Sequence, residues 1–194
     1  GDHNFVYSGD IKYGKSMLLE SARTNFPRVE TLLIESTYGA KEDIQPTREE
    51  VEDAFIKSVN KTLSEGGKVL IPIPAVGRAQ ELMMVIDKYM KSGQLTESSV
   101  FMEGMIQEAT AIHEAHPEYL ERTLRQKILE TDDNPFDSEY FTNIEHADGR
   151  DEPLREDSPC IIIATSGMLE GGPVLEYFRN LAPDKKNKIL FVSY

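Results

Sequence analysis

The chain has 194 residues, 39% of them hydrophobic, which suffices for one substantial core or for one domain and part of another. Acidic residues outnumber basic residues by 34 to 21, and the formal charge of −13 excludes a broad basic face for nucleic acid, so any nucleic-acid contact must be local. Because the sequence has one cysteine, no apolar run of membrane-spanning length and no signal-peptide pattern at its start, we expect a cytoplasmic protein without a membrane partner.

The first 39 residues contain two short strand patterns, each of which ends near an acidic residue. Residues 5–7 precede Asp10 and residues 31–34 precede Glu35, with a helical patch expected between them. An isolated carboxylate at a strand end usually caps a turn or is solvated. Two such carboxylates on consecutive strands are also typical of metal sites and of acid and base pairs. Spacing alone leaves both interpretations open.

Residues 46–63 have the pattern of an amphipathic helix that begins at a strong capping signal. Thr47 is a suitable N-cap, and Glu50 three residues later completes a capping box. The apolar stripe of this helix is expected on Val51, Ala54, Phe55, Val59 and Leu63.

The middle of the chain repeats the order strand, loop, helix. Residues 69–73 and 100–102 are short apolar runs typical of buried strands, and each leads into a helical pattern. Pro117 separates two further helical patterns. Residues 141–144 predict a short strand, and residues 148–158 predict a charged surface loop.

The stretch from Cys160 to Phe178 has the clearest strand, loop and helix pattern, and a last strand is expected at residues 189–192. The loop in this stretch contains Ser166, Gly167, Gly171 and Gly172. Loops at the carboxyl ends of parallel strands collect anions, so these residues could cradle a phosphate. The alternative is that the glycines only permit a tight turn and a helix start. The repeated units predict an α/β fold with a parallel sheet flanked by helices.

Four motifs, in this order across nearly the whole chain, carry a resemblance to a known family. They are Tyr7 to Asp10 (YSGD), Ile34 to Gly39 (IESTYG), Ile71 to Leu82 (IPIPAVGRAQEL) and Ala164 to Met168 (ATSGM). The sequence resembles the β-CASP branch of the metallo-β-lactamase superfamily, and within it the archaeal homologues of the cleavage and polyadenylation specificity factor endonuclease. The resemblance implies the C-terminal part of a metallo-β-lactamase half-domain over residues 1–38 and most of a parallel-sheet β-CASP domain over residues 39–194.

The same resemblance implies a zinc-dependent endoribonuclease that cuts single-stranded RNA in 3′-end processing or transcription termination. Asp10 would be a metal ligand shared by two zinc ions, which can generate hydroxide and stabilise transition-state charge. Glu35 would hydrogen-bond a histidine close to the scissile phosphate. The loop formed by Ser166, Gly167 and Met168 would contact RNA phosphates. Arg78 follows a strand end and could add a charge-assisted phosphate contact or form a structural ion pair.

The histidines depart from the family pattern. The HxHxDH metal motif and the histidine-bearing β-CASP motifs are expected outside residues 1–194, because none of His3, His113, His116 and His146 lies in such a motif. His113 and His116 could share a helix face, as a metal pair or as solvated side chains.

We therefore expect a piece of a longer protein that alone neither retains zinc nor cleaves RNA. The longer protein would hold two zinc ions, and a homodimer of it is compatible with the resemblance. The alternative function is a non-catalytic RNA-binding module of the same family. An unrelated nucleotide-binding α/β domain is disfavoured because neither a G-x-G-x-x-G nor a G-x-x-x-x-G-K-[ST] motif is present.

Overall fold

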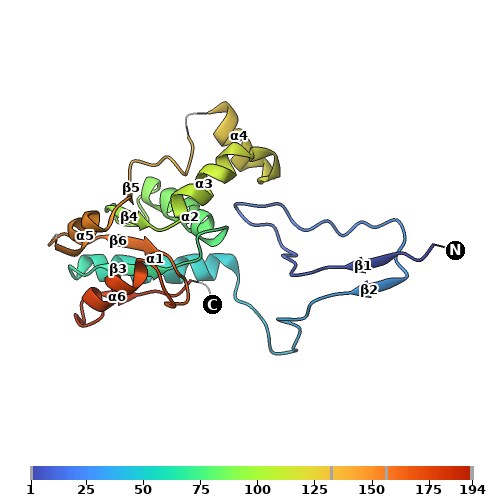
Figure 1. Cartoon of the computed structure of the whole chain (residues 1–194), viewed down its shortest axis with the longest axis horizontal. Helices are drawn as coiled ribbons and strands as arrows, with labels where there is room; N and C mark the ends of the chain where they lie inside the picture. The colour runs from blue at the N-terminus through green and yellow to red at the C-terminus, as the bar shows by residue number, and fades with distance from the viewer. Residues whose placement is uncertain (1, 132, 156, 193–194) are drawn as a thin grey trace.

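The computed structural model describes residues 2–131, 133–155 and 157–192, which form two separate parallel sheets (Figure 1). The smaller sheet pairs β1 (Phe5–Tyr7) with β2 (Thr31–Leu33), and the larger has the strand order β5-β4-β6-β3-β7. The remaining elements in chain order are α1 (Arg48–Ser64), β3 (Val69–Pro72), α2 (Arg78–Lys91), β4 (Val100–Glu103), α3 (Ile106–Ala115), η1 (Pro117–Tyr119), α4 (Arg122–Glu130), β5 (Phe141–Ile144), η2 (Ala147–Arg150), α5 (Asp151–Arg155), β6 (Ile161–Ala164), α6 (Val174–Leu181) and β7 (Lys188–Ile189).

The first helix, α1, begins where the capping signal predicted. The Thr47 hydroxyl accepts a hydrogen bond from the Glu50 N–H at 3.3 Å. In return, the Glu50 carboxylate accepts one from the Thr47 N–H at 2.8 Å. The two side chains thus satisfy backbone donors that a helix N-terminus leaves unpaired.

The predicted apolar stripe of α1 is partly wrong. Val51 and Ala54 are exposed, and the buried residues are Glu52, Ile56, Val59, Thr62 and Leu63. The helix turns Glu52 inward because its carboxylate receives hydrogen bonds from Arg48 of the same helix and from the Tyr89 hydroxyl of α2, at 2.6 Å. A paired carboxylate therefore occupies a place that hydrophobic periodicity assigns to an apolar residue.

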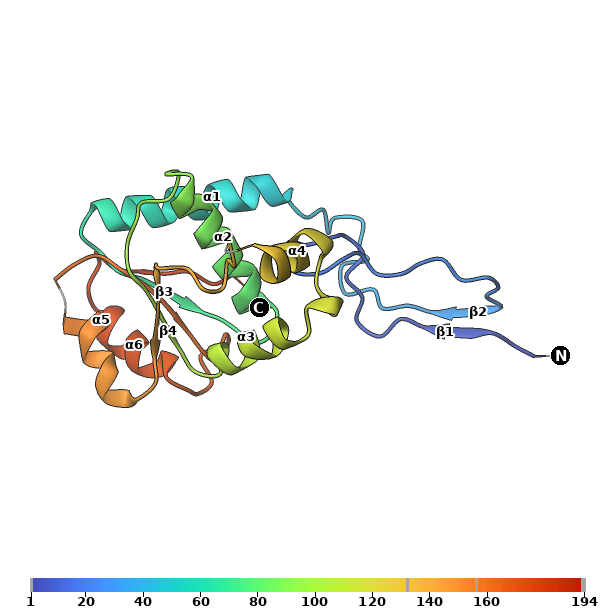
Figure 2. The same cartoon turned by 90° about the horizontal axis from the view of Figure 1, so that it is seen from above.

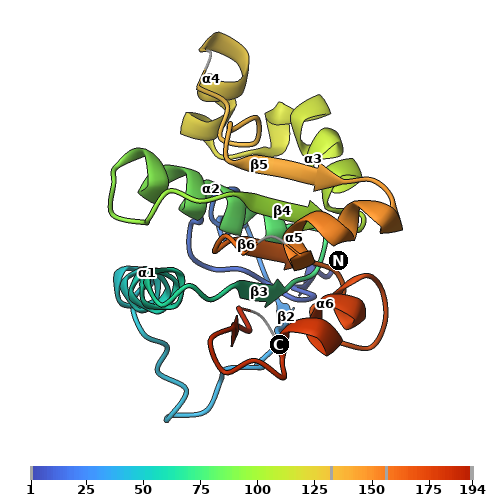
Figure 3. The same ribbon diagram turned by 90° about the vertical axis from the view of Figure 1, so that its left-hand side faces the viewer.

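The three central strands of the five-stranded sheet are buried on both faces. Every residue of β3, β4 and β6 is buried, as their continuous apolar runs predicted. Side chains on one face, such as Ile71 and Ile163, belong to a core that includes α1 and α2, whereas Leu70 and Ile162 on the other face pack with α6. Figure 3 shows α1 and α2 on one side of the strands and α5 and α6 on the other. The layers confirm the predicted α/β fold class.

The strand register places the carboxyl ends of the central strands at one level. Pro72 of β3 and Glu103 of β4 both lie opposite Ala164 of β6. Because all these pairs are parallel, the loops that follow the three strands emerge at the same edge of the sheet. The motifs around Arg78 and Ser166 are thereby brought together from distant parts of the sequence.

Three predicted details differ in the structure. The described residues 8–30 form no helix, although a helical patch was expected there. Within the predicted loop at 148–158, η2 and α5 form, with Pro153 buried. The last strand covers only Lys188–Ile189, because it pairs with β3 only at Val69 and Leu70.

Residues 10–22, which lie between the two strands of the small sheet, contact the body of the protein. Leu18 in this segment is buried; its N–H donates to Glu81 of α2 at 2.8 Å, and its carbonyl accepts from the Glu121 N–H before α4 at 2.9 Å. Lys15 forms an ion pair with Glu121 at 2.7 Å. Figure 2 shows the segment running from the small sheet to the body beside α4. Leu18 therefore acts as an apolar anchor held by backbone hydrogen bonds.

None of the helices formed by the described residues is long and apolar enough to cross a membrane. The small sheet, by contrast, exposes large apolar side chains at Phe5, Tyr7, Leu32 and Leu33. A two-stranded sheet with apolar residues in water is marginal by itself, so this surface is suited to packing against further protein.

Candidate functional site

Asp10 and Glu35 follow adjacent strands of the small sheet. The Ser8 N–H donates to the Leu33 carbonyl at 3.0 Å, and the Glu35 N–H donates to the Ser8 hydroxyl at 3.1 Å, so the chain stays paired beyond the strand ends. The Asp10 side chain is exposed and has no partner among the described residues. The structure thus brings the two predicted acids to neighbouring strand ends.

The Glu35 carboxylate is held by backbone groups. It accepts a hydrogen bond from the Thr37 N–H at 2.7 Å. Hydrogen bonds from the Thr37 backbone and hydroxyl, with a smaller contribution from the Ile11 N–H, lower the pKa of Glu35 below its ordinary value. The contact with Ile11 places this carboxylate beside the residue that follows Asp10. Its expected histidine partner remains a prediction.

The loop after β6 contains the predicted RNA contacts. The Ser166 hydroxyl donates to the Gly171 carbonyl at 3.3 Å and accepts from the Glu170 N–H, so it closes its own loop. Gly167 is buried, and a Cβ there would lie 2.7 Å from Pro74 Cδ, which explains why a glycine stands at this close approach. Met168 is 60% exposed and is the part of this motif open to a ligand.

Arg78 is the first residue of α2 and lies on the loop that follows β3. Its side chain is exposed and forms no ion pair or hydrogen bond with any described residue. The contact of Arg78 with a phosphate remains a prediction. An unpaired guanidinium in a protein with a charge of −13 is available for an anion.

Gln80, which the sequence analysis did not single out, fixes the shape of the Arg78 loop. It is fully buried; its amide oxygen accepts from the Gly77 N–H at 2.7 Å, and its amide nitrogen donates to the Ala75 carbonyl at 3.0 Å and to the Thr110 hydroxyl at 2.9 Å. All of its hydrogen bonds serve the backbone or α3, so Gln80 positions Arg78 without facing solvent.

An ion pair between a buried carboxylate and a half-buried arginine supports the loop after β6. Glu103 at the end of β4 receives hydrogen bonds from Arg150 Nε at 2.8 and 3.0 Å and from the Tyr177 hydroxyl at 2.7 Å. Burial, and then the hydrogen bond to Glu103, raise the pKa of Tyr177, so the phenol stays protonated and donates. The Glu103 carbonyl also accepts the Thr165 N–H at 3.3 Å. The pair thus supports the loop that carries Ser166.

The two sets of strand ends face one another. In Figure 1 the carboxyl ends of β1 and β2 point toward the body that holds the five-stranded sheet, and the arrowhead of β6 points toward the small sheet. The strand ends that Asp10, Glu35 and Ser166 follow in the sequence thus point toward one another in this view.

The described residues do not complete a zinc centre. Among them, no group of three or more His, Cys, Asp or Glu side chains is placed to hold a metal ion. His116 lies beyond the end of α3, and His113 Nδ1 is 2.7 Å from the carbonyl of Ala109 on its own helix, so the two histidines do not form a pair. Asp10 suits one ligand position, but two zinc ions need several more ligands.

Comparisons with known proteins agree with the motifs. A family model described as the Beta-Casp domain matches residues 79–194. The protein named transcription termination factor FttA is 81% identical over 194 residues in Cenarchaeum symbiosum, 53% in Methanocaldococcus jannaschii and 52% in Lokiarchaeum sp.. Each alignment covers the whole of this chain and 30% of the relative, so the chain spans 30% of the length of these curated relatives.

The family match covers more than half of the chain, and it includes the loop after β6, the Glu103 ion pair and most of α2. The chain belongs to the β-CASP branch of the metallo-β-lactamase superfamily.

Proposed function

We propose that this chain forms part of the RNA-cleaving site of a β-CASP nuclease that acts in transcription termination or 3′-end processing. The observation that carries the proposal is the placement of Asp10 and Glu35 at the ends of adjacent strands that face the β-CASP sheet. Carboxylates at strand ends are the residue types that phosphodiester hydrolysis needs for metal binding and for orienting other groups.

Each acid has a role that matches its surroundings. Asp10 is exposed and unpaired among the described residues, so its carboxylate is free to hold a metal ion. Glu35 is already fixed by backbone N–H groups, and its lowered pKa keeps it ionised and able to orient a histidine. Two zinc ions, when bound, would supply a nucleophile at neutral pH and stabilise developing charge. The remaining ligands would come from outside the described residues, so this chain alone would be inactive.

The β-CASP sheet supplies the contacts to RNA. Arg78 would bind a phosphate of the RNA through charge-assisted hydrogen bonds. Met168 would lie against the RNA strand at the mouth of the site. Ser166 and Gly167 would act by holding the loop in shape. The names of the archaeal relatives favour nascent transcripts as the RNA, and hence a cytoplasmic location. We also propose that the longer protein forms a homodimer.

A second candidate is a non-catalytic RNA-binding module. The free guanidinium of Arg78 and the exposed side chain of Met168 favour it, because neither contact depends on Asp10 or on a metal. Under this function the chain would hold RNA while another subunit cuts it.

Binding of a labelled single-stranded RNA to this chain tests the RNA contact. Arg78→Gln is expected to weaken binding and to lower the slope of log K against log salt by about 0.7, the value for one phosphate contact to a single strand. The matched control is Arg155→Gln on α5, which removes the same charge from an exposed side chain paired with Asp151. Fluorescence anisotropy at several salt concentrations measures both variants. An equal loss of RNA affinity in the two variants would show that Arg78 contributes only its net charge.

A further inference from the structure

Two segments that are distant in the sequence meet at the end of the β-CASP body that lies away from the small sheet. They are residues 61–68, from the last turn of α1 to the residue before β3, and residues 179–188, from the last turn of α6 to the start of β7. Together they contain six basic residues and two acidic ones, in a chain whose formal charge is −13. Figure 2 shows α1 running away from the small sheet, so that its last turn lies at the far end of the body. The proposed function assigns no role to these two segments.

The backbone of the second segment is fixed against the first. The side chain of Asn187 joins them: its Oδ1 accepts from the Lys68 N–H at 2.8 Å, and its Nδ2 donates to the Leu181 carbonyl at 3.0 Å. A Cβ on Gly67 would collide with the carbonyl oxygen of Lys186, so the two segments are in direct contact. The turn between α6 and β7 is therefore held in place by the fold before any ligand binds.

Most of the basic side chains on these segments are exposed and unpaired. Of the six, Lys68 is buried, and its Nζ donates to the Pro153 carbonyl at 2.7 Å. The other five form no ion pair or side-chain hydrogen bond with any residue that the structure describes, and we call them the basic surface: Lys61, Arg179, Lys185, Lys186 and Lys188.

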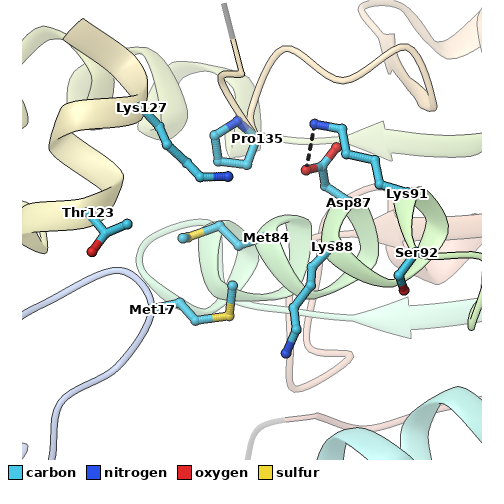
Figure 4. A pocket seen from close by; sticks show the side chains of 9 residues that line it. All are labelled: Met17, Met84, Asp87, Lys88, Lys91, Ser92, Thr123, Lys127 and Pro135. Atoms are coloured by element: carbon cyan, nitrogen blue, oxygen red, sulfur yellow. Dashed lines mark ion pairs between the residues drawn. The ribbon is translucent and has the colours of Figure 1, made fainter. Parts of the chain in front are cut away.

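The lysines that line a pocket of about 500 Å³ between α2 and α4 provide a contrast (Figure 4). Lys91 pairs with the buried carboxylate of Asp87 at 3.0 Å, the dashed contact in Figure 4, and Lys127 pairs with Asp133. A ligand that approached these lysines would compete with carboxylates of the protein itself. The basic surface requires no such exchange, so its cations are available to an anion.

Helix ends explain only part of the basic surface. Lys61 and Arg179 lie in the last turns of α1 and α6, where the helix dipole stabilises a cation. Lys185 and Lys186 lie beyond the last residue of α6, and the dipole effect falls off within the last turn. Two unpaired, adjacent lysines on a fixed turn are therefore left without a structural explanation.

We propose that the basic surface binds phosphate groups of single-stranded RNA, on the flank of the strand whose other part lies at Arg78. A cation that replaces the counterion of a phosphate strengthens binding without reading the base. β3, which separates the two ends of the sheet, has four residues and is about 13 Å long, so one flexible strand can reach both ends. A folded acidic protein would meet the repulsion of the whole chain, whereas a single strand meets only the surface that it follows. The identification of the ligand as RNA rests on the proposed function.

A double variant, Lys185→Gln with Lys186→Gln, tests the proposal against a labelled single-stranded RNA of about 16 nucleotides. Each lost phosphate contact should weaken binding roughly fivefold at about 0.1 M salt, so the double variant is expected to bind about 25-fold more weakly. The slope of log K against log salt should fall by about 1.4, the value for two contacts to a single strand. Fluorescence anisotropy at several salt concentrations measures both quantities, and circular dichroism checks that the variant folds.

Two controls separate a local contact from net charge. Arg28→Gln with Lys41→Gln removes the same charge from exposed residues outside the basic surface, and it should leave most of the RNA affinity in place. Lys185→Arg with Lys186→Arg keeps both charges and should bind RNA as the unaltered chain does. An equal loss of affinity in the Arg28 and Lys41 control would overturn the proposal, and so would a Lys185 and Lys186 double variant that binds RNA normally.

Arg78→Gln distinguishes failure of this proposal from failure of the proposed function. RNA binding that depends on Arg78 but not on Lys185 and Lys186 would remove the basic surface alone. RNA binding that depends on the two lysines, without an effect of Arg78→Gln and without cleavage by the longer protein, would keep the basic surface and remove the proposed function. A poly-glutamate peptide is the last probe: if the lysine variant weakens binding of the peptide but not of RNA, the surface fits an acidic protein and the proposal is wrong.

Discussion

Replacing Arg150 by alanine is expected to lower the free energy of unfolding by about 3–5 kcal/mol, one of the largest effects of any single substitution in this chain. Arg150 is the only described cation that pairs with Glu103, whose side chain is 8% exposed. Without the guanidinium, a buried carboxylate at the end of β4 keeps only the hydrogen bond from Tyr177. Losing one partner of a buried ion pair leaves an uncompensated charge, and this cost exceeds the value of the pair itself.

Urea unfolding followed by circular dichroism measures this loss. The control is Arg155→Ala, a few residues further along the same helical stretch. Arg155 pairs with Asp151, but its side chain is 78% exposed, so its loss should cost about 0.5 kcal/mol or less. Similar midpoints for the two variants would mean that Glu103 finds water or another donor, and that the ion pair does not support the loop after β6.

Gly172→Ala is expected to destabilise the chain by about 2–4 kcal/mol and to displace the loop that carries Ser166. Gly172 has φ +79°, a conformation that costs energy for any residue with a Cβ. A Cβ at this position would also lie 2.7 Å from the Thr165 carbonyl oxygen and 3.3 Å from the Ser166 nitrogen. Both atoms belong to the backbone, so no side-chain rotation can relieve the contact.

The neighbouring glycine provides the control. Gly171 does not have a positive φ in the left-handed region, and a Cβ there would meet nothing within 4 Å. Gly171→Ala should therefore change the free energy of unfolding by about 0.5 kcal/mol or less. Thermal unfolding of the two variants side by side measures the difference. A Gly172→Ala variant as stable as Gly171→Ala would contradict the loop geometry.

The central sheet could be predicted from the sequence because its strands carry their own signal. The apolar runs at residues 69–73, 100–102 and 160–163 correspond to β3, β4 and β6, which are buried on both faces. The start of α1 was predictable for the same reason, since the capping box is a local pattern. The order of the strands in the sheet could not be predicted, because it depends on packing between segments far apart in the chain.

The candidate site was predicted in part. Family motifs pointed to Asp10 and Glu35, and the structure places them on adjacent strand ends. The same motifs did not reveal that Arg78 is unpaired or that Gln80 is buried beneath it, because both facts depend on which residues surround the loop. Glu103 and Arg150 are 47 residues apart, and only the fold shows that they meet. An acid at the end of a buried apolar strand was the one local sign that a partner must exist.

Cleavage of a labelled single-stranded RNA decides whether Asp10 and Glu35 belong to a zinc-dependent nuclease site. This chain is compared with a chain extended at both ends to the length of its archaeal relatives, each with zinc and with a chelator. We expect cleavage only by the extended, zinc-loaded chain, and its loss in Asp10→Ala, because the acids at the strand ends need ligands from elsewhere. Zinc-dependent cleavage by the 194-residue chain alone, abolished by Asp10→Ala, would contradict the claim that its site is incomplete. No cleavage by either chain would contradict the proposed nuclease function.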